Sequence, residues 1–312
     1  MKLSLVMPCY NEEGNIKKMH DMIVSTFEKC DYDYEMVFVN DGSSDKTEQV
    51  INELLDGSEQ KIKLVSFSRN FGKESAMYAG LKNADGEYVA IIDSDCQQNP
   101  DIVRNMVEML DSNSSVDCVT AYQQERNESK TLRFFKKSFY RIINKISDTN
   151  FKADASDFRT MRRNMVDAVL EMSEYHRFSK GIFSWVGFNN VFIPYVADQR
   201  ASGNTKWSFF KLFKYAMDGI IAFTTAPLKI STFIGILSAF AAIFYMIWVI
   251  IQKLVFGIAV PGYATLVVLI LLLGGLQLFA LGIIGEYLSR TYIQSKRRPI
   301  YIAKEIKNNY KK

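Results

Sequence analysis

Asp93 and Asp95 stand two residues apart at the end of the apolar run 88–92, in the segment Asp93-Ser-Asp-Cys-Gln97. Side chains two apart on a strand share a face, so both carboxylates project to one place where the chain leaves a sheet. Hard cations such as Mg2+ or Mn2+ prefer carboxylate and amide oxygens, and Gln97 could supply one more. One interpretation is therefore a metal site at Asp93, Asp95 and Gln97. The other is an Asx turn or helix cap before Pro100.

The first two hundred residues alternate between strand-like and helix-like segments. Strands are predicted at 2–7, 34–39, 62–67, 88–92 and 116–121. Helical spacing and capping residues predict helices between them, at 15–27, 46–55, 74–82 and 101–110. Such alternation predicts an α/β fold with a mainly parallel sheet covered on both faces, and ligands bind beyond the carboxyl ends of the strands in such sheets.

Polar residues follow four of the predicted strands, at 10–13, at Asp41, at 68–70 and at 93–95. Turn chemistry could explain any one of these groups, but four at one rim indicate a ligand site. Neither a Gly-x-Gly-x-x-Gly after the first strand nor a P-loop occurs, which argues against dinucleotide dehydrogenases and P-loop NTPases. A metal beside a nucleotide at the strand ends suggests a nucleoside-diphosphate donor, whose diphosphate the metal would neutralise as the leaving group.

Two uncharged runs, 233–251 and 264–284, lie in the last third of the chain. Each is long enough to cross a hydrocarbon core of about 30 Å at about 1.5 Å per residue, although a buried core helix is the alternative for each. The segments outside the pair are rich in lysine and arginine. Positive flanks stay in the cytoplasm, so we expect a multi-pass plasma-membrane protein whose catalytic domain and both termini are cytoplasmic.

The sequence predicts four regions: a cytosolic catalytic domain (1–204), interfacial amphipathic helices (205–230), a two-helix transmembrane hairpin (231–290) and a basic cytosolic tail (291–312). Aromatics with lysines between them at 207–217 favour a helix lying in the membrane interface, and a packed globular helix is the alternative. The strand-like start of the chain has no cationic leader, so we expect no signal peptide.

Metal clusters of cysteine and histidine and nucleic-acid partners are disfavoured by composition. The four cysteines have no paired spacing and only two histidines are present, so a zinc cluster is not expected. The net charge of +4 is concentrated near the two uncharged runs, which suits an anionic lipid surface better than nucleic acid.

Several motifs in order along the chain resemble a known family. They are Pro8-Cys-Tyr-Asn-Glu-Glu13, Val39-Asn-Asp-Gly-Ser-Ser-Asp-Lys-Thr47, Ser68-Arg-Asn-Phe-Gly-Lys-Glu74, Asp93-Ser-Asp-Cys-Gln97, Ser156-Asp-Phe-Arg159, Gly285-Glu-Tyr-Leu-Ser-Arg-Thr-Tyr292 and Lys296-Arg-Arg-Pro-Ile-Tyr301. Together they resemble the family-2 glycosyltransferases, and within them the polyisoprenyl-phosphate glycosyltransferases similar to dolichol-phosphate-mannose synthase. The resemblance implies inverting transfer of a sugar from a nucleotide donor to the phosphate of a membrane polyprenol, on a glycosyltransferase-A type sheet.

The resemblance also implies roles for individual residues. The implied donor-binding residues are Pro8, Tyr10, Asn11, Glu12, Asp41, Lys73, Asp93, Ser94, Arg200 and Lys206, and the implied metal ligands for Mg2+ or Mn2+ are Asp93, Asp95 and Gln97. For Arg200 and Lys206, a basic stripe attracted to anionic lipid is the alternative.

The implied catalytic residues are Asp157 and Asp95. An acceptor phosphate with a second pKa near about 6 is mostly dianionic at neutral pH, so Asp157 could orient the acceptor rather than act as a strong base. A structural ion pair with Arg159 is the alternative. The implied acceptor-binding residues are Arg126, Lys137, Ser138, Arg141 and Arg159, although the helix predicted around Lys137 could equally be a solvated face.

Some positions depart from the family pattern. Cys96 replaces the usual leucine, and Gln98-Asn99 replaces the usual Asp-Pro; these changes should be tolerated if the side chains face away from the metal. Lys180 stands where an arginine is common, and so does Ala197. These two changes weaken the implied phosphate contacts in that segment.

Two other functions compete. A processive polysaccharide synthase would carry a Gln-x-x-Arg-Trp motif and more membrane segments, which the sequence lacks, and a silent membrane scaffold would not need Asp93, Asp95 and Asp157. We favour UDP-glucose over UDP-N-acetylglucosamine as donor. Relatives suggest a homo-oligomer packed through the membrane end.

Overall fold

The computed structural model describes residues 1–28, 30, 32–123, 144, 155–196, 219–256 and 262–310. The chain divides into two compact units. The first, here called the sheet unit, comprises Met1–Lys145, Thr149–Gly219 and Pro299–Lys312. The second, the helical unit, comprises Ile146–Asp148 and Ile220–Arg298.

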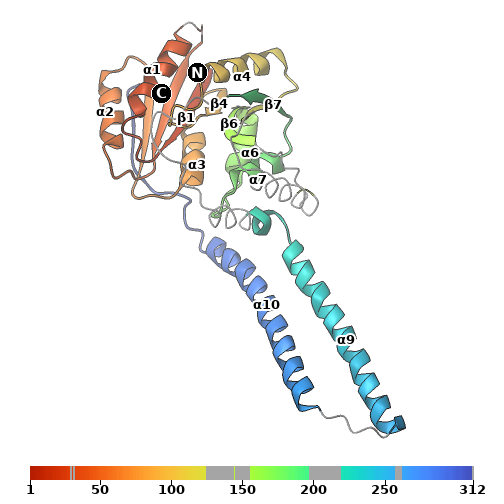
Figure 1. Ribbon diagram of the computed structural model, residues 1–312. Coiled ribbons are helices and arrows are strands. Elements are labelled where there is room, and N and C mark those ends of the chain that lie inside the picture. Colours follow the sequence, from red (N-terminus) through yellow and green to blue (C-terminus); the bar gives the residue numbers. More distant parts are fainter. Residues whose placement is uncertain are drawn as a thin grey trace. The chain divides into compact units, whose positions relative to one another are not determined.

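The described strands of the sheet unit form one mixed sheet of eight strands, in the order β7-β5-β6-β4-β1-β2-β3-β8 (Figure 1). The strands are β1 (Leu3–Cys9), β2 (Tyr34–Asn40), β3 (Lys61–Phe67), β4 (Tyr88–Ile91), β5 (Cys118–Gln123), β6 (Ala155–Arg162), β7 (Asn190–Tyr195) and β8 (Ala303–Asn308). The neighbours β4, β1, β2 and β3 are parallel, whereas β6 and β8 run antiparallel to the strands beside them. The predicted α/β fold with a mainly parallel sheet is confirmed.

Helices cover both faces of this sheet. On one face α1 (Ile16–Phe27), α2 (Thr47–Gly57) and α4 (Pro100–Ser112) enclose the main apolar core. On the other face α3 (Lys73–Asn83) packs on β1 and β2 and also contacts α6 (Arg163–Glu171). The contact with β1 is close, because a Cβ at Gly80 would lie 2.1 Å from Cγ1 of Val6. This packing fixes the start of α3 beside the ends of the parallel strands.

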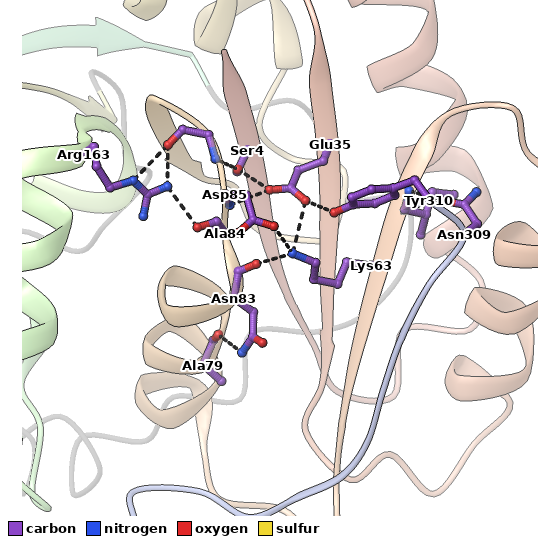
Figure 2. A network of polar contacts seen from close by, with 12 residues as sticks. Ser4, Glu35, Lys63, Ala79, Asn83, Ala84, Asp85, Arg163, Asn309 and Tyr310 are labelled. Carbon is purple, nitrogen blue, oxygen red and sulfur yellow. Dashed lines mark hydrogen bonds and ion pairs between the residues drawn. The ribbon is translucent and has the colours of Figure 1, made fainter. Parts of the chain in front are cut away.

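A buried polar network lies near the amino-terminal ends of the parallel strands (Figure 2). Glu35 is fully buried and accepts hydrogen bonds from the Ser4 hydroxyl at 2.6 Å and from the Asp85 amide at 2.7 Å. Lys63 Nζ lies 3.4 Å from Glu35 and 2.7 Å from Asp85, and the Tyr310 hydroxyl donates to Glu35. Because every charge in the group has a partner, the network can tie β1, β2, β3 and the last residues of the chain together.

The strand β8 was not predicted from the sequence, which assigned 291–312 to a tail. The segment reads as polar because its side chains alternate in charge at a sheet edge, where charged residues are common. Its pairing partner β3 is far away in sequence, and the two strands run antiparallel from Lys63 opposite Asn308 to Phe67 opposite Ala303. The strands β6 and β7 were also not predicted.

The helical unit contains α9 (Ala226–Phe256) and α10 (Tyr263–Ser295). Among the described residues, two stretches are long and apolar enough to cross a membrane: Ala226–Gln252, with 27 residues, and Thr265–Ser295, with 31. The Tyr287 hydroxyl of α10 donates to the carbonyl oxygen of Thr224, just before α9, at 2.7 Å. The two apolar helices expected near the end of the chain are therefore present.

Candidate active site

The loops that follow β1 and β2 are joined by hydrogen bonds. The Asn11 amide donates to the Ser43 hydroxyl at 3.0 Å, and the Ser44 amide donates to Asn11 Oδ1 at 2.8 Å. The Glu12 amide donates to the Thr47 hydroxyl at 2.8 Å. Asn11 has a positive φ of 56°, a conformation that asparagine tolerates better than most residues. Asn11 therefore shapes the rim, while Tyr10 beside it is exposed and available to a ligand.

Asp41 joins the loop after β2 to the loop after β3. Its carboxylate accepts hydrogen bonds from the amides of Phe71 at 2.7 Å and Gly72 at 2.9 Å. Burial raises the pKa of Asp41, and these two amides and the charge of Arg69 oppose the increase only in part. Gly42 lets the two loops approach, because its φ is 63° and a Cβ there would lie 2.4 Å from the carbonyl carbon of Arg69. Asp41 therefore holds the loops after β2 and β3 together, and its donor contact stays a prediction.

The structure shows which residue caps α4, the helix that follows the Asp93 loop. The N-cap of α4 is Asn99, whose side chain accepts a hydrogen bond from the Asp101 amide at 2.9 Å, and Pro100 follows at the first helical position. The carboxylate of Asp93 is therefore not needed to cap this helix. Ser94 donates to the Pro8 carbonyl at 3.0 Å, which joins this loop to the end of β1.

Gln98 does not face away from the site. Its Oε1 accepts a hydrogen bond from the Asp93 amide at 2.8 Å, and its Nε2 donates to Asp93 Oδ2 at 2.9 Å. The condition under which the change at this position was expected to be tolerated, a side chain that faces away, is therefore not met by Gln98. Cys96 does point inward to a buried position, with a φ of 59°. The only sequence signal for Gln98 was an amide side chain where the family usually has a carboxylate.

Lys73 connects Asp93 to Asp157. Its ammonium lies 2.6 Å from Asp93 Oδ1 and 3.3 Å from Asp157 Oδ2. Lys73 is the first residue of α3, Asp93 follows β4 and Asp157 lies on β6, so three elements bring these charges together. Burial by itself would lower the pKa of Lys73, but the two carboxylates outweigh burial and raise it. Lys73 therefore stays protonated, and its side chain as a whole is 47% exposed.

Asp157 is held ionised in a mostly buried position. Burial by itself would raise its pKa, but the charges of Lys73, Lys180 and Arg159 outweigh burial and lower it. Its Oδ1 is buried and accepts no hydrogen bond from the described residues. A carboxylate oxygen left without a donor in this position is suited to receive a substrate group.

Arg159 lies under the site rather than at its surface. It is 3% exposed, its guanidinium donates to the Ser156 carbonyl at 2.8 Å, and it stacks over the Phe183 ring at 3.9 Å. This placement favours an electrostatic effect on Asp157 over direct contact with an acceptor. The ion-pair alternative for Asp157 is met instead by Lys73, at 3.3 Å.

The acidic residues at the rim fit a divalent cation. Burial raises the pKa of Glu12, and the charges of Asp95, Asp45 and Asp93 add to that increase, although the hydrogen bond from Asn15 opposes it. In the described part of the chain no group of three or more acidic, histidine or cysteine side chains forms a complete metal cage. Two carboxylates completed by substrate phosphates and water are the usual setting for Mg2+. Asp93 and Asp95 match that donor set.

Some predicted site residues lie outside the described residues: Arg126, Lys137, Ser138, Arg141, Arg200 and Lys206. Gln97 is described, and its backbone amide donates to Asp95 Oδ1 at 3.1 Å, so the Asx turn named as the alternative for this segment is present at Asp95. The structure thus brings together Pro8, Asn11, Glu12, Asp41, Lys73, Asp93, Ser94, Asp95 and Asp157 in the loops and strand ends of the sheet unit.

An α/β sheet with acidic residues at its strand ends is an arrangement found among nucleotide-binding enzymes, and comparison with known proteins identifies the family. Residues 4–170 match the model described as glycosyl transferase family 2, and residues 226–291 match the GtrB C-terminal hairpin. The chain belongs to glycosyl transferase family 2, and the resemblance seen in the sequence is confirmed.

Two relatives align over nearly the whole chain. A protein of Escherichia coli (strain K12), described as a prophage bactoprenol glucosyl transferase homolog, is 41% identical over 98% of this chain and 100% of its own length. The bactoprenol glucosyl transferase of Shigella phage SfV is 41% identical over 98% of this chain and 99% of its own. Among solved structures, glucosyl-3-phosphoglycerate synthase from Mycobacterium tuberculosis is 18% identical with a TM-score of 0.47, over 70% of this chain and 77% of that one.

Proposed function

We propose that the protein transfers glucose from UDP-glucose to the phosphate of a membrane polyprenol, with inversion at the sugar. Membership of glycosyl transferase family 2 and the names of the two relatives at 41% identity support this reaction. The observation that carries it is the group of Lys73, Asp93 and Asp157, with the ammonium 2.6 Å from one carboxylate and 3.3 Å from the other. With a divalent cation beside Asp93, such a group would have the positive charge to receive an anionic donor and an anionic acceptor side by side.

The donor would lie across the loops after β1, β2 and β4. In this proposal Pro8, Tyr10, Asn11, Glu12 and Asp41 bind the nucleoside, and Lys73 and Ser94 lie near the diphosphate. Arg200 and Lys206 remain proposed phosphate ligands. A divalent cation, Mg2+ or Mn2+, held by Asp93, Asp95 and Gln97 would neutralise the leaving diphosphate. Gln98 orients Asp93 through its two hydrogen bonds.

The acceptor phosphate would attack the anomeric carbon from the face opposite the diphosphate. A new bond forms between a phosphate oxygen and that carbon, the bond from the carbon to the donor phosphate breaks, and the diphosphate leaves with the electron pair. The acceptor phosphate is mostly dianionic at neutral pH, so only the small protonated fraction has a proton to lose. Asp157 therefore orients the acceptor or takes a residual proton, and Lys73 offsets the charge of the approaching phosphate. Arg126, Lys137, Ser138 and Arg141 remain proposed acceptor contacts, while Arg159 would act through Asp157.

The apolar helices fit a lipid acceptor. We propose that α9 and α10 form a hairpin in the plasma membrane, with residues 1–204, the interfacial segment 205–230 and the tail 291–312 on the cytoplasmic side. The basic segments outside the hairpin support that orientation. A homo-oligomer packed through the hairpin belongs to the same proposal.

The decisive experiment uses the full-length protein in detergent or liposomes with radiolabelled UDP-glucose and polyprenyl phosphate. We expect a labelled lipid that requires a divalent cation and disappears in Asp95→Asn. Parallel reactions with UDP-N-acetylglucosamine and other sugar nucleotides identify the donor. A polymeric product would favour a processive synthase, and absence of labelled lipid from every donor would contradict the proposal.

A further inference from the structure

The segment Arg298-Pro-Ile-Tyr301 is part of the family resemblance, but no step of the proposed reaction uses it. From Pro299 onward the chain belongs to the sheet unit. Tyr301 stands two residues before the edge strand β8, and its ring lies against Phe67 at the carboxyl end of β3, where the loop 68–72 begins. This is the loop whose amides bind Asp41.

Tyr301 packs on the last residue of β3. Its ring is stacked on Phe67, with ring centroids 4.8 Å apart and an interplanar angle of 20°. It also meets Tyr78 of α3 edge-on, at 6.4 Å between centroids. The next residue, Ile302, accepts a hydrogen bond from the Ser68 amide at 3.0 Å through its carbonyl oxygen. Tyr301 and Ile302 therefore fix the point at which the chain leaves β3.

The contacts continue through the loop to the donor site. Phe67 meets Phe71 edge-on, with centroids 5.7 Å apart. Phe71 and Gly72 then donate their amides to Asp41, at 2.7 Å and 2.9 Å. The following residue, Lys73, carries the ammonium that lies between Asp93 and Asp157. A displacement of Phe67 would therefore move the amides that bind Asp41 and the start of α3.

We propose that Tyr301 is a positioning residue for donor binding. By stacking on Phe67 it holds the loop 68–72 so that Asp41 keeps both amide donors and Lys73 keeps its place. This rests on the proposed function, because Asp41 and Lys73 are donor-site residues only if the donor binds there. The segment that follows the two apolar helices thus supports the donor site, which is built from residues near the start of the chain.

The hydroxyl of Tyr301 contributes little to this role. Its one contact with a described residue is with Asn83 Nδ2, at 3.5 Å, which is long for a hydrogen bond. The aromatic ring of Tyr301, and not its hydroxyl, therefore supports the loop, and we expect Tyr301→Phe to be tolerated. Alanine would leave a space against Phe67 and free the loop.

The other end of the same segment supplies a matched control. Tyr310 donates its hydroxyl to Glu35, and Asn309 pairs with the backbone of Ile62 (Figure 2). These contacts lie at the amino-terminal ends of the strands, away from the loop 68–72. Tyr310→Phe should therefore affect the anchoring of the segment without affecting the donor site.

The test measures UDP binding by calorimetry and the donor KM of full-length Tyr301→Ala, Tyr301→Phe and Tyr310→Phe. Because an aromatic pair contributes modestly, we expect Tyr301→Ala to weaken UDP binding and raise the donor KM about threefold to tenfold. The other two variants should stay within about twofold of the wild type, since each keeps the ring at 301. Thermal unfolding of each variant establishes that the protein measured is folded.

Two results would overturn the role of Tyr301: a folded Tyr301→Ala with unchanged UDP affinity and donor KM, or a Tyr301→Phe that is as impaired as Tyr301→Ala. Failure of the proposed function would look different. In that case the wild-type protein would form no glycolipid, or would not bind UDP at all.

Discussion

Gln98 and Asp93 are joined by two hydrogen bonds, one from the Asp93 amide to Gln98 Oε1 at 2.8 Å and one from Gln98 Nε2 to Asp93 Oδ2 at 2.9 Å. The pair fixes both the backbone and the carboxylate of Asp93. One oxygen of that carboxylate is thereby engaged, and the other lies against Lys73. Gln98 thus sets the direction in which Asp93 presents its charge.

Replacing Gln98 by leucine should weaken the metal site without emptying it. Loss of an oriented hydrogen bond to a metal ligand typically costs about 10- to 100-fold in metal affinity or activity. Titration with Mn2+ followed by electron paramagnetic resonance measures affinity separately from turnover. As a control, Gln49→Leu removes an exposed glutamine of α2 whose side chain donates to Glu53 at 3.0 Å, and it should leave the titration unchanged. Identical Mn2+ affinity in Gln98→Leu and wild type would disprove the role.

Replacing Lys73 by methionine should separate turnover from metal binding. The change removes the cation that faces Asp93 and Asp157, and loss of a positioned electrostatic group typically lowers kcat by about 10²–10³-fold. Metal affinity should be equal or higher, because a competing positive charge beside Asp93 is gone. Steady-state kinetics and the same Mn2+ titration provide the two readings. A variant that keeps its kcat but loses metal affinity would contradict this assignment.

The fall in kcat/KM at low pH, the acid limb of the pH profile, should reflect protonation of the acceptor phosphate rather than of Asp157. Burial alone would raise the pKa of Asp157, but Lys73, Lys180 and Arg159 bring it below its ordinary value of about 3.9. A carboxylate whose pKa is lowered by folding stabilises the fold above its unfolded pKa, and that contribution is lost as the pH falls through the folded pKa. Asp157 is therefore ionised from about pH 5 upward, whereas the second pKa of the acceptor phosphate is about 6.

The measurement is kcat/KM against pH with polyprenyl phosphate and with a phosphonate analogue, whose second pKa is higher. We expect the acid limb to move to higher pH with the analogue. Asp157→Asn should lower the rate by a similar factor across the range and leave the limb in place. If the acid limb stays at the same pH with the analogue, the group that titrates belongs to the enzyme and not to the acceptor.

Gly42→Ala should destabilise the protein and weaken donor binding. The residue has a φ of 63°, and a Cβ would lie 2.4 Å from backbone in the loop after β3, so the loops around Asp41 must separate. Gly57→Ala is the matched control, because a Cβ there meets nothing within 4 Å. Thermal unfolding and UDP calorimetry should show a loss for the first variant alone. Equal stability of the two variants would argue against the close approach.

Lys63→Met should be strongly destabilising. It leaves the fully buried Glu35 without its cation, and breaking a buried ion pair in this way costs about 3–5 kcal/mol. Lys61→Met is the control, since its pair with Asp33 at 2.6 Å has side chains 38% and 50% exposed. An exposed pair of that kind contributes about 0–1 kcal/mol. Denaturant unfolding of both variants compares the two costs, and a similar small loss in each would contradict the structural role of the network.

Local patterns were enough to predict the parallel core of the sheet and the two apolar helices. The strand at 88–92, the helix 15–27 and the run 233–251 each carry their own periodicity, so their type follows from neighbouring residues. The pair Asp93 and Asp95 could likewise be recognised from its motif, but β4 ends at Ile91 and both residues lie after it, so the argument that they share one face of a strand was wrong. The strand β8 could not, since an edge strand of alternating charges resembles a polar tail until its partner β3 is known.

The amino-acid sequence by itself determined the family, the parallel core of the sheet and the two apolar helices. Only the tertiary structure decided that Asn99 caps α4, that Gln98 holds Asp93, that Lys73 lies between Asp93 and Asp157, and that Tyr301 packs on Phe67. The physical reason is the separation in sequence between the residues that interact. Secondary structure and motifs depend on residues a few positions apart, whereas most of these contacts join distant segments whose approach is fixed by packing around the sheet.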